Sequence, residues 1–139
     1  MSEYLIDSNG LKIEFHYEDA KASETLLFLP GSYANKSAWK GIVKALKIPC
    51  KKVFTSLRGY GNTEETRSVI DYKIDHQLEI IRTISKKLNS DFHIVGHSMG
   101  GLVGFAAVFS GEFPIKSIIT FEGNPPWVLD AFKYRETLN

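Results

Sequence analysis

A lone serine stands between glycines in the stretch HIVGHSMGG, residues 93–101, and its type and setting suit covalent chemistry. The run before Ser98 is apolar enough for a buried strand, and the glycine-rich run after it reads as the start of a helix. A nucleophilic serine must hold its hydroxyl clear of the backbone and beside donors that stabilise an oxyanion. A sharp strand-to-helix turn does both, but it strains the serine and brings the strand close to the helix. Such a turn has no room for side chains two residues before and two residues after the serine, and these positions are Gly96 and Gly100.

The same turn points the first N–H groups of the following helix, and the positive end of its dipole, at the place where negative charge would develop. We therefore expect the backbone N–H of Met99 to be one oxyanion donor. His97 lies inside the turn, where the geometry directs its ring away from the serine hydroxyl, so a packing or loop-capping role is predicted for it. The alternative for Ser98 is a purely structural turn residue.

The elements that would position this turn can be predicted from hydrophobic patterning. Residues 3–19 alternate apolar and polar positions around a Ser-Asn-Gly turn, which is typical of an antiparallel hairpin. Residues 25–32, TLLFLPGS, form an apolar run that suits a strand covered on both faces. Residues 36–47 have apolar side chains at helical spacing, with Ser37 as the predicted cap.

The rest of the chain alternates strand and helix patterns. Strands are predicted over 51–57, 92–98 and 115–124, and helices over 72–89 and 99–111. Strands that alternate with helices build a parallel sheet. The sequence thus predicts an α/β fold with a mostly parallel sheet, an antiparallel N-terminal hairpin, and no domain boundary within the chain.

This sequence resembles the α/β-hydrolase superfamily, whose G-x-S-x-G nucleophile elbow is represented by GHSMGG. The segment LPGSYANKSAW resembles the family's oxyanion loop, and that alignment implies a second backbone donor at Ser32. SLRGYGNT resembles the family's D-x-R-G-x-G-x-S segment with Ser56 in place of aspartate, while Pro30 replaces a common histidine. ITFEGNPPW resembles the end of the sixth strand, where a cap often begins.

The resemblance also implies which parts to expect elsewhere. The family's catalytic histidine follows the eighth strand and its acid usually follows the seventh, both beyond Asn139. In some members the acid follows the sixth strand, where Glu122 stands, so Glu122 is a candidate acid. We expect residues 1–139 to be the N-terminal portion of one α/β-hydrolase domain, with strands 1–6 only, the C-terminal strands missing, a cap just beginning, and little activity alone.

The predicted function is hydrolysis of an ester, thioester or amide through an acyl-serine intermediate. The serine argues against dehalogenase or epoxide-hydrolase chemistry, because the relatives with those activities carry aspartate at the elbow. The alternative is a non-catalytic or degenerate hydrolase-like domain that acts by binding or dimerisation. Its sixth strand, SIITF, would then be an exposed apolar edge, through which a homodimer is predicted.

Composition narrows the partners. With 17 Lys+Arg against 16 Asp+Glu, neither charge gathers into a long run, so no nucleic-acid or membrane partner is predicted beside a small acyl substrate. Cys50 is the sole cysteine, and the start lacks signal-peptide character, which favours a cytoplasmic location. The histidines lack metal-ligand spacing, so no metal and no cofactor is predicted. Arg58 is expected to brace its loop, and Trp127 and Phe132 to line a pocket or pack.

Overall fold

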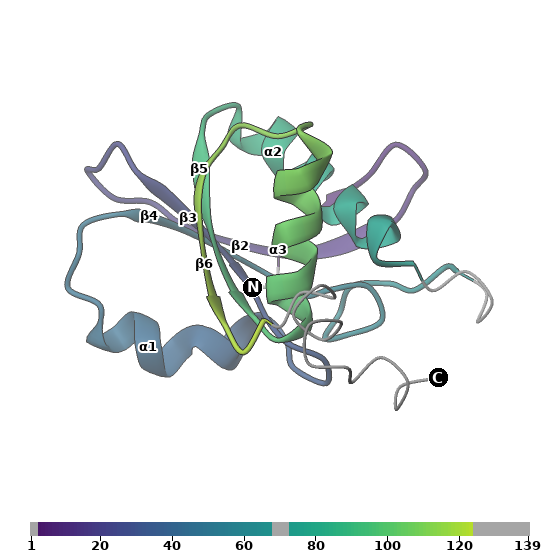
Figure 1. Cartoon of the computed structure of the whole chain (residues 1–139), viewed down its shortest axis with the longest axis horizontal. Helices are drawn as coiled ribbons and strands as arrows, with labels where there is room; N and C mark the ends of the chain where they lie inside the picture. Colours follow the sequence, from purple (N-terminus) through teal and green to yellow (C-terminus); the bar gives the residue numbers. More distant parts are fainter. Residues whose placement is uncertain (1–2, 68–72, 124–139) are drawn as a thin grey trace, which may run out of the picture.

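One twisted sheet organises the computed structural model, which describes residues 3–67 and 73–123 (Figure 1). Its six strands are β1 Glu3–Ile6, β2 Lys12–Glu18, β3 Thr25–Leu29, β4 Lys51–Thr55, β5 Phe92–His97 and β6 Ile115–Phe121. They lie in the order β1-β2-β4-β3-β5-β6. β2 is antiparallel to both β1 and β4, whereas β4, β3, β5 and β6 run parallel. The predicted mixed sheet with its N-terminal hairpin is confirmed.

The hairpin turn is closed by a side chain. Asp7 Oδ1 accepts hydrogen bonds from the N–H groups of Asn9 (2.8 Å) and Leu11 (2.7 Å), and Gly10 adopts a φ of 84°. These local bonds satisfy the turn and set the β1–β2 register, in which Leu5 faces Ile13. The Ser-Asn-Gly segment therefore forms the turn of the β1–β2 hairpin, as predicted.

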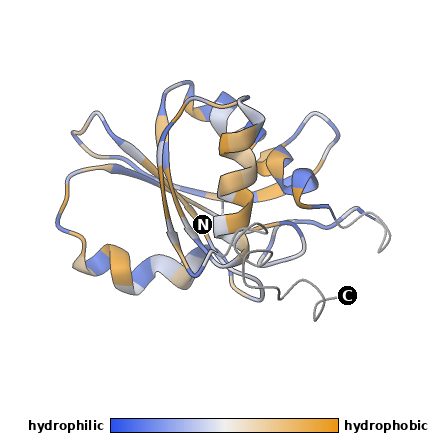
Figure 2. Cartoon of the chain, in the orientation of Figure 1, coloured by the Kyte–Doolittle hydropathy of each residue, from blue (hydrophilic) through white to orange (hydrophobic). Residues whose placement is uncertain are grey.

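Helices cover both faces of the sheet, as Figure 1 shows. Successive strand residues point to opposite faces, so Leu27 and Ile94 join a core with α2 Leu78–Leu88 and α3 Met99–Ser110, whereas Phe28 and Val95 face the other way. Figure 2 shows α3 as largely hydrophobic along its length, which fits a helix that packs on a sheet. Strands buried on both faces need apolar residues at successive positions, which explains the continuous apolar runs in β3 and β5.

The region around α1 Lys40–Ala45 differs from the prediction of one helix over 36–47. A 3₁₀ turn occupies Lys36–Trp39 before α1 begins. The predicted cap at Ser37 is wrong: the Asn35 side chain accepts from the N–H of Ser37 at 2.9 Å, so the cap lies two residues earlier. Trp39 anchors this region by packing on Phe28, with ring centroids 5.3 Å apart.

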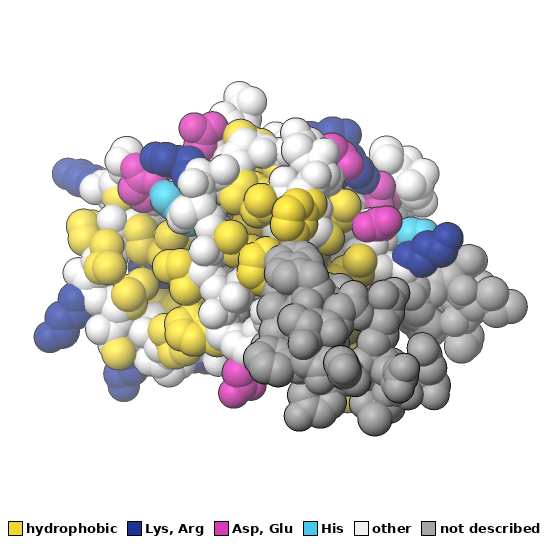
Figure 3. All heavy atoms as spheres, in the orientation of Figure 1, with side chains coloured by type: hydrophobic (Ala, Val, Ile, Leu, Met, Phe, Trp, Pro, Cys, Tyr) yellow, Lys and Arg dark blue, Asp and Glu magenta, His cyan; other side chains and the backbone are white. Residues whose placement is uncertain are grey.

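The sheet has an exposed apolar side at β6. Within the described residues β6 pairs with β5 alone, and Ile119 and Phe121 are 55% and 47% exposed. Figure 3 shows hydrophobic side chains gathered on this face of the molecule. Among the residues described, no helix has the length and apolar character needed to cross a membrane.

Candidate active site

Ser98 lies in the turn that joins β5 to α3, and its backbone is strained. Its φ of 49° and ψ of −116° fall outside the regions that ordinary side chains adopt. The Ser98 N–H donates to the carbonyl of Phe121 at 2.9 Å, and its own carbonyl accepts from the N–H of Leu102 at 3.1 Å. These bonds hold the serine to β6 on one side and to the first turn of α3 on the other. The structure therefore contains the sharp strand-to-helix turn expected from the sequence.

The flanking glycines allow two backbones to meet. A Cβ atom added at Gly96 would lie 2.7 Å from the carbonyl oxygen of Gly100, within the first turn of α3. A Cβ atom added at Gly100 would overlap the carbonyl oxygen of Leu29 and lie 2.6 Å from that of Pro30. Since these neighbours are backbone atoms of packed elements, they cannot move aside cheaply. Both positions require glycine for the reason given by the elbow pattern.

The loop after β3 reaches the serine because β3 and β5 are parallel neighbours. Leu29 is paired with Gly96, so both strands end at the same edge of the sheet. A Cβ atom added at Gly31 would lie 3.3 Å from Cβ of Ser98, which shows how closely the loop backbone approaches. Among residues 3–67 and 73–123, neither the N–H of Ser32 nor that of Met99 is used in a hydrogen bond. Both predicted oxyanion donors thus remain at this edge with uncommitted N–H groups.

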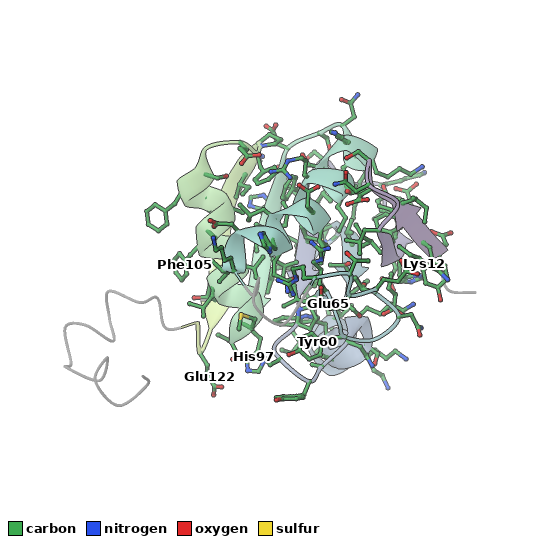
Figure 4. The ribbon with its side chains drawn as sticks, turned by 90° about the vertical axis from the view of Figure 1, so that its right-hand side faces the viewer. Lys12, Tyr60, Glu65, His97, Phe105 and Glu122 are labelled. Atoms are coloured by element: carbon green, nitrogen blue, oxygen red, sulfur yellow. The ribbon has the colours of Figure 1, made fainter. Side chains whose placement is uncertain are left out.

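His97 and Glu122 contact each other. His97 Nε2 lies 3.3 Å from Glu122 Oε2, and the two side chains are 45% and 81% exposed. Figure 4 shows them together at the edge of the molecule. Glu122 follows β6 in a left-handed backbone conformation, with a φ of 53°. The packing or loop-capping role of His97 and the role of Glu122 as triad acid both stay predictions.

The other three histidines make contacts outside the elbow turn. His93 bridges Glu24 and Ser117, with both contacts at 2.7 Å, and His16 lies 3.5 Å from Glu18. His76 uses its carbonyl to accept from Arg58 Nη1 at 3.2 Å. In the part of the chain that the structure describes, no three potential metal ligands come together.

Arg58 acts as the expected brace. Besides its bond to His76, its Nη2 donates to Thr66 Oγ1 at 2.8 Å, so the guanidinium joins the loop after β4 to the segment before α2. The predicted pocket residues Trp127 and Phe132 lie outside the described residues.

A buried carboxylate beside the loop after β3 was missed by the sequence reasoning. Glu14 on β2 has a side chain only 5% exposed, and Ser56 Oγ donates to its Oε2 at 2.6 Å. Lys36 Nζ lies 3.0 Å from Oε1, and Asn62 donates from its N–H (3.3 Å) and its Nδ2 (3.2 Å). The one signal in the sequence was Ser56 itself, which stands where the resembled segment carries aspartate. Glu14 supplies a carboxylate from the adjacent strand.

The surroundings of Glu14 favour its ionised form. Burial by itself would raise the pKa of this carboxyl, but hydrogen bonds from Ser56, Lys36 and Asn62, with the charge of Lys36, outweigh burial and hold the pKa below its usual value. The group is therefore an anion at neutral pH.

Two pockets flank the elbow. One of about 370 Å³ is lined by residues that include Tyr60, Gln77, Met99 and Leu102. The other, of about 430 Å³, is lined by residues that include Pro30, Trp39, His97 and Phe121. The first pocket also has the charged side chains of Arg58, Glu65 and Arg67 in its wall, whereas the second is walled mainly by apolar side chains.

We predict that Gly100→Ala destabilises the protein by about 1–3 kcal/mol or more, because the new methyl group overlaps backbone atoms at the end of β3. Urea-induced unfolding of the protein expressed from its complete gene measures the change. Gly41→Ala is the matched control, since Gly41 is also helical but has no atom within 4 Å of an added Cβ. That control should be neutral or stabilising by up to about 1 kcal/mol. Equal destabilisation of both variants would contradict the close approach.

We predict that part of the stability is lost on acidification through Glu14. Its pKa in the folded state is lowered from the ordinary 4.5, so its contribution is present above pH 4.5 and is lost as the pH falls through the folded value. Glu14→Gln should remove this contribution and cost about 1–3 kcal/mol at pH 7. Unfolding free energies measured from pH 7 to 3 should therefore converge for the wild type and the variant. A constant difference across this range would contradict the prediction.

Comparison with known proteins agrees with the fold. The sequence model of the alpha/beta hydrolase fold matches residues 24–138. Monoacylglycerol lipase ABHD6 of Homo sapiens is 36% identical over 93 residues, which cover 65% of this chain and 27% of the lipase. Pimeloyl-[acyl-carrier protein] methyl ester esterase of Aeromonas hydrophila is 31% identical over 100 residues, or 72% of this chain and 38% of the esterase.

A solved structure gives the same fold. An epoxide hydrolase structure from metagenomes of hot environments superposes on this chain with a TM-score of 0.84 at 20% identity. The match covers 96% of this chain and 46% of that one. The chain thus spans less than half the length of each of these three proteins. With the match of the family model over most of its length and the elbow geometry described above, this chain belongs to the α/β-hydrolase fold family.

Proposed function

We propose that this chain carries the nucleophile and oxyanion hole of a serine hydrolase that cleaves carboxylic esters, thioesters or amides. The observation that carries the proposal is the strained Ser98 between β5 and α3, with the backbone of Gly31 packed against it. Strain at this point costs free energy and persists only where the surrounding structure enforces it. A turn serine of no chemical use would not need two uncommitted N–H groups nearby.

The proposed reaction has two half-steps. Ser98 Oγ attacks the carbonyl carbon while a base takes its proton, and the N–H groups of Ser32 and Met99 hold the oxygen that becomes negative. The tetrahedral intermediate collapses, the bond to the leaving group breaks, and the base returns the proton to the alcohol, thiol or amine. Water then attacks the acyl-serine by the same route, which releases the acid and restores Ser98.

The base in this proposal is a histidine from the part of the fold that this chain does not span. Side-chain hydrogen bonds or ion pairs tie His16, His93 and His97 to other residues, whereas Nδ1 of His76 is buried without a hydrogen-bond partner among the described residues. Glu122 is one candidate for the acid that orients such a histidine, although in this structure its carboxylate meets His97. The aligned segments cover only 27% and 38% of these two relatives, so both proteins have room for a histidine and an acid outside the segment that matches this chain.

The two named relatives support an ester as the substrate, since one is a monoacylglycerol lipase and the other a methyl ester esterase. We propose the carboxylic ester class on that basis. A serine at the elbow agrees with it, because a serine nucleophile carries an acyl group between alcohol and water. The cytoplasmic location stays a prediction.

We predict that Ser98→Ala abolishes covalent labelling by a fluorophosphonate probe in the protein expressed from its complete gene. The probe needs a nucleophilic oxygen that forms a bond to phosphorus and displaces fluoride, and alanine has none. Labelling is read by gel fluorescence and by mass spectrometry of the peptide that contains residue 98. The control Ser23→Ala, at an exposed position before β3, should label at the wild-type rate. Undiminished labelling of Ser98→Ala would overturn the assignment of the nucleophile.

A second candidate function is dimerisation by a non-catalytic domain, and the exposed Ile119 and Phe121 on β6 favour it. Two β6 edges could pair and bury these side chains. Light scattering should then give twice the monomer mass, and Ile119→Lys should restore the monomer. A monodisperse wild-type monomer at all concentrations tested would contradict this candidate.

A further inference from the structure

Two loops converge on the carboxylate of Glu14. One is the segment from Gly31 to Lys36, which contains the proposed oxyanion donor, and the other is the segment from Ser56 to Thr63. In the first segment, Lys36 forms an ion pair with Glu14 at 3.0 Å. In the second, Asn62 donates two hydrogen bonds to Glu14. These contacts link loops that lie about twenty residues apart in the chain to a third element, β2.

Ser56 connects the carboxylate of Glu14 to the backbone of the first loop through two hydrogen bonds. Its Oγ donates to Glu14 Oε2 at 2.6 Å and accepts from the N–H of Lys36 at 2.9 Å. The hydroxyl thus uses its single donor and one of its two acceptor lone pairs, which fixes the direction of both bonds. Thr63 adds a second link, because its Oγ1 accepts from the N–H of Glu14 at 3.0 Å and donates to the carbonyl of Ser56 at 2.8 Å.

The far end of the first loop is therefore anchored, and its near end abuts the nucleophile. Between these ends the loop is tightly turned: Ala34 donates to the carbonyl of Gly31 at 3.3 Å, and Tyr33 has a φ of 61°. The Tyr33 ring meets that of Tyr60 edge-on at 5.9 Å, which joins the two loops again. Only three residues separate Lys36 from Ser32, so a shift of Lys36 would be passed to Ser32.

We propose that Glu14 is a positioning residue for the oxyanion hole: its buried carboxylate, acting through Ser56 and Lys36, fixes the loop that presents the N–H of Ser32 to the substrate oxygen. This inference rests on the proposed function. Glu14 does not touch the substrate. Because Ser56 Oγ is only 2.6 Å from the carboxylate, an aspartate at position 56 can place a carboxylate in nearly the same space. The proposed positioning role requires a carboxylate at this place, whichever strand carries it.

The test measures the rate at which a fluorophosphonate probe labels Ser98 in the protein expressed from its complete gene, with probe binding separated from the bond-forming step. Glu14→Gln should lower the bond-forming rate about tenfold or more, since a displacement of about 1 Å near reacting atoms can cost 100-fold. Probe affinity should change little. The double variant Glu14→Ala with Ser56→Asp should recover most of the rate, because it moves the carboxylate instead of removing it.

Two further variants keep the test decisive. Ser56→Ala retains the pair between Glu14 and Lys36 but removes the bond to the Lys36 N–H, so it should slow labelling even if Glu14→Gln does not fold. Glu24→Gln is the control, because it removes a carboxylate paired with Lys116 and His93 at the opposite end of the parallel strands. That control should label at the wild-type rate.

The outcomes separate the two proposals. No labelling of wild-type Ser98 would overturn the proposed function itself. Wild-type labelling that is unchanged in both Glu14→Gln and Ser56→Ala would leave the function standing and overturn the positioning role. Slower labelling that the relocated carboxylate fails to restore, in a double variant that unfolds at the wild-type temperature, would also overturn it.

Discussion

The approach of α3 to the ends of β3 and β5 is the constraint on which the site depends. Gly96 and Gly100 let backbone meet backbone at distances that a Cβ atom would not permit. With the helix held so close, the connecting residue has no room for an ordinary conformation, and Ser98 takes a φ of 49°. The strain at Ser98 results from the close packing of α3 on the strand ends, and the same packing directs the first turn of α3 at the hydroxyl.

The parallel register turns this local constraint into a site. Strands that run parallel end at the same edge, so the loop after β3 and the turn after β5 meet although they are more than sixty residues apart in the chain. The pairing of Leu29 with Gly96 sets that meeting to within one residue. The core on both faces of the sheet keeps the register, because a slip by one residue would turn Phe28 and Leu27 to the wrong faces.

In the Glu14 cluster, a carboxylate from β2 lies beside Ser56, the residue that stands where the resembled family segment carries aspartate. A buried anion needs donors on all sides, and Ser56, Lys36 and Asn62 provide them. In return, the anion links β2 to the loop after β3 and to the loop after β4. Loops near a reacting centre contain little hydrophobic surface, so a charged hydrogen-bonded centre is an effective way to order them.

Local patterns in the sequence determined the strands, the hairpin turn and the elbow, because period, turn residues and the spacing of Gly96, Ser98 and Gly100 are properties of neighbouring residues. The cap at Asn35 was missed, because Asn35 and Ser37 are both of a residue type that caps helices and lie only two positions apart. Only the tertiary structure decided that His97 meets Glu122 and that Glu14 lies beside Ser56. Those contacts join residues 25 and 42 positions apart, and no local preference encodes which distant side chains the sheet brings together.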